Sequence, residues 1–130
     1  MVSAIALLAV AQLAPASRDV PPLGRYTVYQ IVPAVDFPQF VYAGVVELGA
    51  KGKYVFRYDK SKPKGSGVYA VANRKVTFRT GPYSDLTADY KVRDRGVPAL
   101  NGKLQVKSGK VELVMTHDAY EKASKQKVRR

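Results

Sequence analysis

Between residues 25 and 115 the sequence alternates apolar and polar side chains, and turn-forming residues interrupt the alternation every eight to twelve residues. In one such segment Val76 and Phe78 fall on one face, and Lys75, Thr77 and Arg79 fall on the other. A period of two is the pattern of a β-strand with one buried face, whereas a helix repeats every ~3.6 residues. Short strands at this spacing are typical of small all-β domains. The pattern therefore predicts an all-β fold.

The alternating segments can be counted from the turns that separate them. They span residues 25–32, 40–48, 53–59, 67–72, 75–80, 86–93, 103–107 and 110–116. Short loops between successive strands favour an antiparallel up-and-down meander, and about eight strands suffice to close a barrel without a free edge. We therefore predict an eight-stranded antiparallel meander that closes into a small barrel. An open two-sheet sandwich built from the same strands is the alternative.

Glycine and proline mark the expected irregularities of this meander. Gly44 lies inside the second segment and predicts a bulge or a strong bend. Pro63 and Gly65 predict a loop, and Ser108-Gly109 predicts a two-residue hairpin turn. We expect a longer loop between residues 93 and 103, where the sequence contains Gly96, Pro98 and Asn101-Gly102.

The N-terminal residues differ in composition from the rest of the chain. Residues 1–17 carry no charged side chain, and the apolar run from Ala4 ends in Ala14-Pro15-Ala16, a small-x-small pattern. This combination predicts a signal peptide over residues 1–16 and therefore an exported bacterial protein, periplasmic or extracellular. The alternative is an N-terminal helix packed on the domain. The expected organisation is a signal peptide (1–16), an extended linker (17–24), a barrel domain (25–117) and a basic tail (118–130).

The charge balance is strongly basic. Lys and Arg number 22 against 10 Asp and Glu, which gives a net charge of +12. A surplus of this size attracts polyanions such as acidic polysaccharide or anionic lipid, although it also serves simply to keep a protein in solution. We expect polyanion contacts from a basic loop and from the tail, which forms a short helix or stays solvated. The candidate residues are Lys60, Lys62, Lys64, Lys125, Lys127, Arg129 and Arg130.

The residues needed for catalysis are scarce. The chain has no cysteine and one histidine, His117, which we expect at a solvated strand end beside Asp118. Nucleophilic catalysis needs a nucleophile beside a base, and metal sites need converging ligands, but neither spacing is present. The glycines lie in separate turns rather than in one phosphate-binding loop. We therefore predict a non-enzymatic protein with no catalytic residues, no metal and no cofactor.

Aromatic side chains are the main candidates for ligand binding, because the short chain contains nine tyrosines. The strand phasing places several rings on one side of the sheet. A tyrosine suits a pocket that is apolar in its body and polar at one end. These rings either line a ligand cavity or fill an ordinary core. The candidate ligand-binding residues are Tyr54, Phe56, Tyr58, Phe78 and Tyr90.

One group of motifs resembles a pattern found in small secreted bacterial β-proteins of unknown function. It consists of Gly52-Lys53-Tyr54-x-Phe56, Gly67-x-Tyr69 and Val76-x-Phe78-x-x-Gly81-Pro82. In outline the meander is also similar to the calycin barrels, the lipocalins and avidins. Lipocalins carry Gly-x-Trp on their first strand, where this chain reads Gly24-Arg25-Tyr26. The resemblance implies a barrel and an export route, and it assigns no binding residue.

Two functional hypotheses result from these features. The first is an exported, non-enzymatic β-barrel that binds a small apolar or amphipathic ligand in its tyrosine-rich interior. The second is a cationic adaptor that associates with envelope polyanions or an acidic protein through the basic loop and tail. An inhibitory loop over residues 93–102, acting on an exported hydrolase, is a third possibility. Sequence-specific nucleic-acid binding is not expected, because aromatic and basic residues fall on opposite faces of the segment 53–59.

Overall fold

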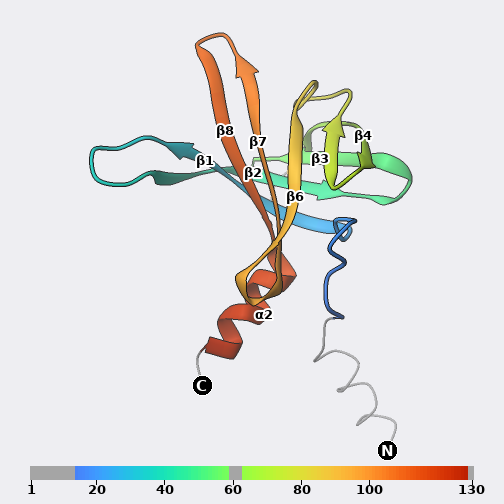
Figure 1. The fold of residues 1–130 in the computed structure, drawn as a ribbon. Helices are drawn as coiled ribbons and strands as arrows, with labels where there is room; N and C mark the ends of the chain where they lie inside the picture. The colour runs from blue at the N-terminus through green and yellow to red at the C-terminus, as the bar shows by residue number, and fades with distance from the viewer. Residues whose placement is uncertain (1–13, 59–62, 129–130) are drawn as a thin grey trace, which may run out of the picture.

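The structure is a computed structural model that describes residues 14–58 and 63–128. It forms a closed antiparallel barrel in which the strands lie in sequence order (Figure 1). The predicted eight-stranded meander is therefore confirmed, and the open sandwich is not found. The strands are β1 (Gly24–Val32), β2 (Gln39–Leu48), β3 (Lys53–Arg57), β4 (Pro63–Ala72), β5 (Lys75–Phe78), β6 (Thr87–Arg93), β7 (Val97–Val106) and β8 (Gly109–His117).

The barrel closes where the first strand pairs with the last. The β1–β8 register runs from Tyr26 opposite His117 to Ile31 opposite Glu112. Each strand therefore has a neighbour on both sides over part of its length, which removes the free edges that an open sheet would leave. This closure accounts for the alternation in the sequence, because every strand has one face toward a shared interior.

A bulge in β2 shapes the first hairpin. Val28 pairs with Gly44, but the next residue, Tyr29, pairs with Tyr42, so Ala43 is the extra residue. Gly44 has a φ of +125°, and a Cβ there would lie 2.7 Å from the Phe56 ring. The predicted irregularity at Gly44 is therefore confirmed. Beyond it, the β1–β2 hairpin projects away from the barrel (Figure 1).

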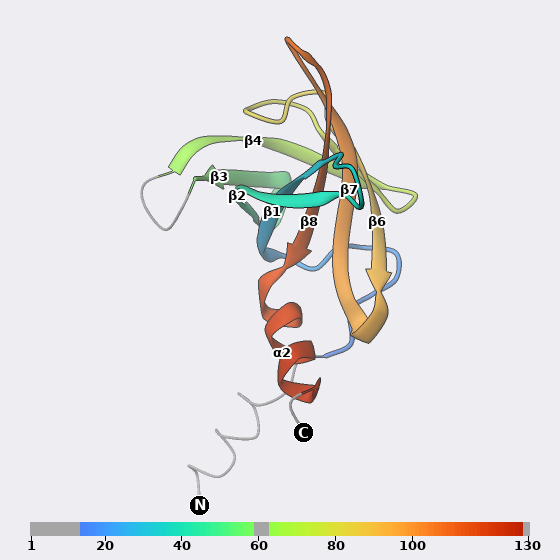
Figure 2. The same ribbon diagram turned by 90° about the vertical axis from the view of Figure 1, so that its left-hand side faces the viewer.

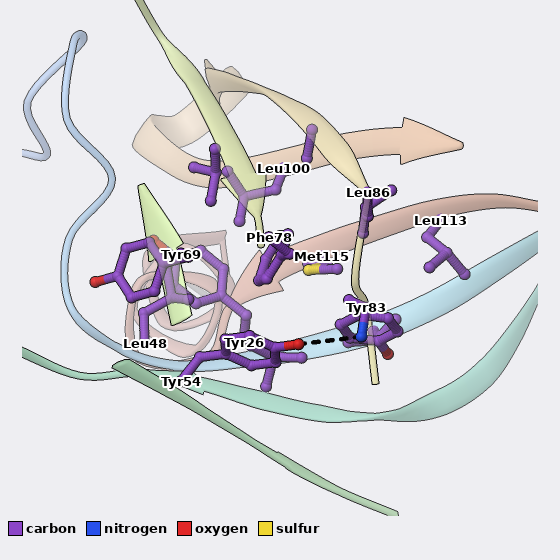
Figure 3. Packing of buried hydrophobic residues seen from close by; sticks show 14 of the residues in the cluster. Tyr26, Leu48, Tyr54, Tyr69, Phe78, Tyr83, Leu86, Leu100, Leu113 and Met115 are labelled. Atoms are coloured by element: carbon purple, nitrogen blue, oxygen red, sulfur yellow. Dashed lines mark hydrogen bonds between the residues drawn. The ribbon is translucent and has the colours of Figure 1, made fainter. Parts of the chain in front are cut away.

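The interior holds one hydrophobic core with contributions from all eight strands. In β5, Val76 and Phe78 are fully buried, whereas the preceding residue, Lys75, is exposed. Burying a large side chain stabilises a fold by about 1.5–3 kcal/mol, so these inward residues hold the barrel together. The largest fully buried side chains include Tyr26, Tyr54, Phe78, Leu86, Leu100 and Met115 (Figure 3).

The expected loop over residues 94–102 is wrong, because most of it belongs to a strand. Only a short 3-10 turn, η2 (Asp94–Gly96), separates β6 from β7. Pro98 pairs with Val92 of β6, whereas the pairing of β7 with β8 begins only at Ala99. Because Pro98 has no partner on β8, the N–H that proline lacks is not needed for the β7–β8 hydrogen bonds. Gly102 marks a close approach instead of a turn, since a Cβ there would lie 2.5 Å from the Thr87 carbonyl oxygen.

Two other expected turns differ from the prediction: the predicted loop at Pro63 and Gly65 is part of a strand, and the two-residue turn before β8 lies one residue earlier than expected. β4 begins at Pro63, so Pro63 and Gly65 lie in a strand. Proline is tolerated as the first residue of a strand because no ladder N–H is needed there. The β7–β8 turn consists of Lys107 and Ser108, since Val106 pairs with Gly109.

The C-terminal segment is helical from Asp118 to Val128 and is labelled α2. It packs beside the lower ends of β7 and β8 (Figure 2). The Thr27 hydroxyl on β1 donates to Asp118 Oδ1 at 2.5 Å, which ties the first turn of the helix to the barrel. A carboxylate at this position also interacts favourably with the helix dipole. Over residues 14–58 and 63–128, no helix is long and apolar enough to cross a membrane.

The predicted linker packs against the barrel, and we name residues 17–23 the N-terminal strap. The Tyr90 hydroxyl donates to the Ser17 carbonyl, and the Tyr26 hydroxyl donates to the Pro22 carbonyl at 2.7 Å. Pro21 is buried. The strap therefore has fixed partners on the barrel. Most of the predicted signal peptide, residues 1–13, lies outside the described residues.

Candidate functional site

The main concentration of aromatic side chains lies in the hydrophobic core, where Tyr54, Tyr69, Phe78 and Tyr83 gather (Figure 3). The rings of Tyr54 and Phe78 meet edge to face with centroids 4.9 Å apart. Tyr83 contacts Phe78 at 5.8 Å and Phe56 at 5.4 Å. Tyr69 completes the group at 6.4 Å from Phe78. Edge-to-face pairs at these separations each add about 0.5–1.5 kcal/mol beyond their buried area. We name these five residues the aromatic cluster.

The Tyr54 hydroxyl has two backbone partners inside this cluster. It donates to the Thr80 carbonyl oxygen at 2.7 Å and accepts from the Tyr83 N–H at 3.0 Å. Burial raises the pKa of Tyr54, although the Tyr83 amide partly opposes the rise because it stabilises the phenolate. Tyr54 is therefore neutral at ordinary pH, with its hydroxyl holding the segment between Thr80 and Tyr83 in place.

That segment, the β5–β6 loop (residues 79–86), lies against β4, where the Arg79 N–H donates to the Val68 carbonyl at 2.8 Å. Its own backbone is closely bonded, with the Asp85 N–H donating to the Phe78 carbonyl at 2.8 Å and the Leu86 N–H donating to the Tyr83 carbonyl at 2.9 Å. The loop turns Tyr83 and Leu86 inward, and both are buried. The loop therefore fills part of the interior, and we name it the plug.

The glycines of β4 make room for the plug. A Cβ at Gly65 would lie 2.5 Å from Pro82 Cγ, and a Cβ at Gly67 would lie 2.1 Å from the Thr80 carbonyl oxygen. Gly81 has a φ of +89°, and a Cβ there would lie 2.7 Å from the Tyr54 hydroxyl oxygen. The motifs Gly67-x-Tyr69 and Gly81-Pro82 thus meet around one loop, together with Tyr54. Their spacing is explained by the packing of this plug.

The structure separates the five predicted ligand-binding residues. Tyr54, Phe56 and Phe78 belong to the aromatic cluster, and Tyr90 is buried in the same core with its hydroxyl on the strap. The expectation that Tyr58 faces inward is wrong, because this side chain is 58% exposed. β3 ends at Arg57, so Tyr58 lies on the rim, where its ring still contacts Phe56 at 6.1 Å.

Sequence reasoning missed Tyr83, the ring at the centre of the cluster. Tyr83 follows Gly81-Pro82 in a turn, and the alternation that identifies inward residues applies only within strands. The adjacent Gly81-Pro82 is itself typical of a turn. No local feature of the sequence indicates that this turn folds into the barrel.

The expectation of a solvated His117 is wrong, because the side chain is only 7% exposed. The Ala119 N–H donates to His117 Nδ1 at 3.2 Å, so Nε2 carries the proton and donates to the Leu23 carbonyl at 2.8 Å. The imidazole also contacts the rings of Tyr26 and Tyr120, at 4.9 and 5.0 Å. His117 therefore joins the strap, the barrel and α2.

The predicted polyanion-binding residues are distributed over separate elements. Lys64 is exposed near the start of β4, and Lys125 is exposed on α2, where its Nζ lies 3.8 Å from Glu121 Oε1. Lys60, Lys62, Arg129 and Arg130 lie outside the described residues, as does the Lys127 side chain. Within the described chain, the tail residues belong to an ordered helix attached to the barrel.

Two hollows flank the C-terminal half of β6, and both include Lys91 and Arg93 in their walls. The first has a volume of about 540 Å³, and its apolar wall includes Ile31, Phe40 and Val114. The second, of about 510 Å³, is lined by further basic residues from outside β6. Among the residues that the structure describes, no group of three or more histidine or carboxylate side chains could hold a metal ion.

Comparisons with protein-family models, with curated protein sequences and with solved structures found no match to this chain. The closed barrel, its aromatic cluster and the basic hollow beside β6 are therefore the features from which its function can be inferred.

Proposed function

We propose that this protein is an exported, non-catalytic β-barrel that binds a small apolar or amphipathic molecule at its aromatic cluster. The observation that supports this function is an unbroken series of ring contacts from the surface into the core. The exposed Tyr58 contacts Phe56, Phe56 contacts Tyr83, and Tyr83 contacts Phe78. A path of this kind offers an apolar ligand contact at the rim and continuous contact inward.

The chemistry of the path favours a ligand that is apolar in body and polar at one end. At the rim, the Tyr42 hydroxyl donates to the Tyr58 carbonyl at 2.8 Å, so polar groups are available next to exposed rings. Farther in, the ring of Tyr83 occupies the position between Phe56 and Phe78. A ligand would enter by replacing this ring, which requires the plug to move.

Support for a non-catalytic role comes from His117. Both of its ring nitrogens are engaged with the backbone, one at Leu23 and the other at Ala119. A general base must offer a free nitrogen to the proton that it abstracts. The geometry of His117 is that of a structural residue.

Native mass spectrometry of the protein purified from its own source tests whether a ligand is bound. We expect an added mass that organic solvent removes.

A titration with the fluorescent probe 8-anilinonaphthalene-1-sulfonate then locates the site. Tyr58→Ser should weaken binding several-fold, because this exposed ring begins the path. The matched control is Val68→Thr, an exposed residue on the outer face of β4, which should leave binding unchanged. Equal affinities for the two variants would contradict the proposal.

Export is supported by the composition of residues 1–16 and is tested separately. Expression in a bacterial host should yield a processed protein outside the cytoplasm, and intact-mass measurement should place its first residue at Ser17. Recovery of the chain only in the cytoplasm, with residues 1–16 retained, would contradict export.

The cationic adaptor is the second candidate, because α2 presents Lys122 and Lys125 as exposed residues of an ordered element. Removing the tail would be a poor test, since Asp118 and Ala119 are bonded to the barrel. Lys122→Gln with Lys125→Gln removes the charges and retains the helix. Adaptor binding to anionic vesicles or polysaccharide should then fall and should collapse at high salt, whereas binding of an apolar ligand should respond little to salt.

A further inference from the structure

The hollow of about 510 Å³ beside β6 brings together basic side chains from three parts of the chain. Arg18 comes from the N-terminal strap, Arg74 from the β4–β5 turn, and Lys91 and Arg93 from β6. Figure 2 shows the strap, in blue, passing beside the lower part of β6. The Tyr90 hydroxyl fixes the strap there through the Ser17 carbonyl. The arrangement therefore depends on the tertiary structure and not on a basic run in the sequence.

Most of the charges in this hollow have no oppositely charged partner among the residues that the structure describes. Within residues 14–58 and 63–128, none of Arg18, Lys91 and Arg93 forms an ion pair. Arg74 Nε lies 3.2 Å from Asp19 Oδ1, and both of these side chains are largely exposed. Like charges that converge on one hollow repel one another, and an anion placed among them would relieve this repulsion.

The backbone at Arg74 is a second, independent observation. Asn73 and Arg74 form a two-residue turn between Ala72 and Lys75, with φ values of +53° and +60°. Both central residues of such a turn need a left-handed conformation, and the second is usually glycine because a side chain is disfavoured there. Arginine at this position is conformationally unfavourable, and unfavourable backbone geometry tends to occur at functional sites.

The sheet also leaves space at this place. β5 pairs with β6 only from Lys75 opposite Asp89 to Thr77 opposite Thr87, so Lys91–Arg93 extend past the end of β5. The Tyr90 N–H bonds the Arg74 carbonyl at 2.8 Å, which places the turn at the border of the hollow. A ligand can therefore approach this side of β6 without displacing a strand.

From these observations we infer that the hollow is a binding site for a small oxyanion with two or more negative charges, of the phosphate or carboxylate type. Guanidinium groups suit this ligand because their planar N–H pairs match two oxygens of a phosphate or carboxylate. Arg74 and Arg93 would bind the oxygens, and Arg18 and Lys91 would add charge. The site is separate from the aromatic cluster, and the inference does not depend on the proposed ligand there.

Arg74→Gly gives the sharpest test, because glycine suits the turn and removes only the side chain. The probes are pyrophosphate and citrate, titrated by calorimetry at low salt, with thermal unfolding measured on the same samples. We expect Arg74→Gly to unfold at the same or a higher temperature than the parent protein and to bind the preferred probe about tenfold more weakly. Arg93→Ala should weaken binding by a similar factor. The probe that binds with the higher affinity shows whether the site prefers a phosphate or a carboxylate ligand.

Lys110→Ala is the matched control, since this exposed lysine near the β7–β8 turn lies at the opposite end of β8 from α2 (Figure 1). It should leave the affinity unchanged while lowering the net charge by the same amount. Failure of both probes to bind the parent protein would overturn the inference. An equal loss of affinity in Lys110→Ala and Arg74→Gly would also overturn it, because binding would then follow net charge alone.

Discussion

The α-carbon of Gly67 lies so close to the Thr80 carbonyl that a Cβ on Gly67 would stand 2.1 Å from the oxygen. This contact joins β4 to the β5–β6 loop and sets how deeply the loop enters the barrel. No side chain can occupy that position unless the backbone of the loop moves. The inward placement of Tyr83 therefore depends on the absence of a side chain one strand away.

Gly67→Ala should expel the plug. The added methyl group meets backbone atoms that cannot rotate away, and overpacking of this kind costs about 1–3 kcal/mol. Thermal unfolding should show this loss, and near-ultraviolet circular dichroism should show a changed tyrosine environment. Val68→Ala, a change at the neighbouring exposed residue, is the control. Unchanged stability of Gly67→Ala would mean that the plug does not pack as described.

Tyr54→Phe should destabilise the same loop without changing the core volume. The ring contacts with Phe78 remain, but the Thr80 carbonyl and the Tyr83 N–H lose their shared partner. An unsatisfied buried group costs about 1–3 kcal/mol. Denaturant unfolding should show a loss in this range, whereas Tyr42→Phe at the exposed rim should change stability by less than about 0.5 kcal/mol. Similar values for the two variants would contradict the assigned role of Tyr54.

His117→Phe should weaken the junction of strap, barrel and α2. Phenylalanine can keep the ring contacts with Tyr26 and Tyr120, but it cannot pair with the Leu23 carbonyl or the Ala119 N–H. We expect a loss of about 2 kcal/mol in the free energy of unfolding. Amide hydrogen exchange should speed up in the first turn of α2. Protection in α2 as strong as in the parent protein would argue against this role.

Alkaline pH should unfold the protein. Burial raises the pKa of Tyr26, with further rises from Tyr90, Tyr69 and Tyr120, and burial also raises the pKa of Tyr83. In the unfolded chain these groups titrate near pH ~10. The stability that they contribute is therefore complete below this pH and is lost as the pH rises through the folded-state values. The ultraviolet absorbance of tyrosinate should rise together with loss of the β-sheet circular dichroism signal. Full titration of the tyrosines in a folded barrel would contradict the burial of these rings.

Much of the fold follows from local patterns in the sequence. Alternation alone predicts that Val76, Phe78 and Tyr90 face inward, and all three are buried. Gly44 was predicted to interrupt its strand, and a bulge lies there. These predictions succeed because strand periodicity and glycine conformation are properties of a few adjacent residues.

The wrong predictions concern residues whose role is set by a distant part of the chain. Pro98 and Gly102 are residues typical of a loop, but both lie in β7. The neighbouring strands do not need the N–H that Pro98 lacks, and the close approach of β6 at Gly102 leaves no room for a side chain. His117 looked solvated because its partners, Leu23 and Ala119, are contributed by the strap and the helix. Tyr58 followed the inward phase of β3, but the strand ends one residue before it.

The sequence by itself determined a meander of eight antiparallel strands with an apolar inner face and most charges outside, because hydrophobic alternation is encoded residue by residue. It left open whether these strands close into a barrel or form a sandwich. Only the tertiary structure decided that β1 pairs with β8 to close the barrel, that the β5–β6 loop turns Tyr83 inward, and that Arg18, Arg74, Lys91 and Arg93 line one hollow. These groups lie far apart in the sequence, and strand closure and the path of the strap bring them together. The physical reason is that binding surfaces depend on non-local contacts, which no periodicity in a single strand can specify.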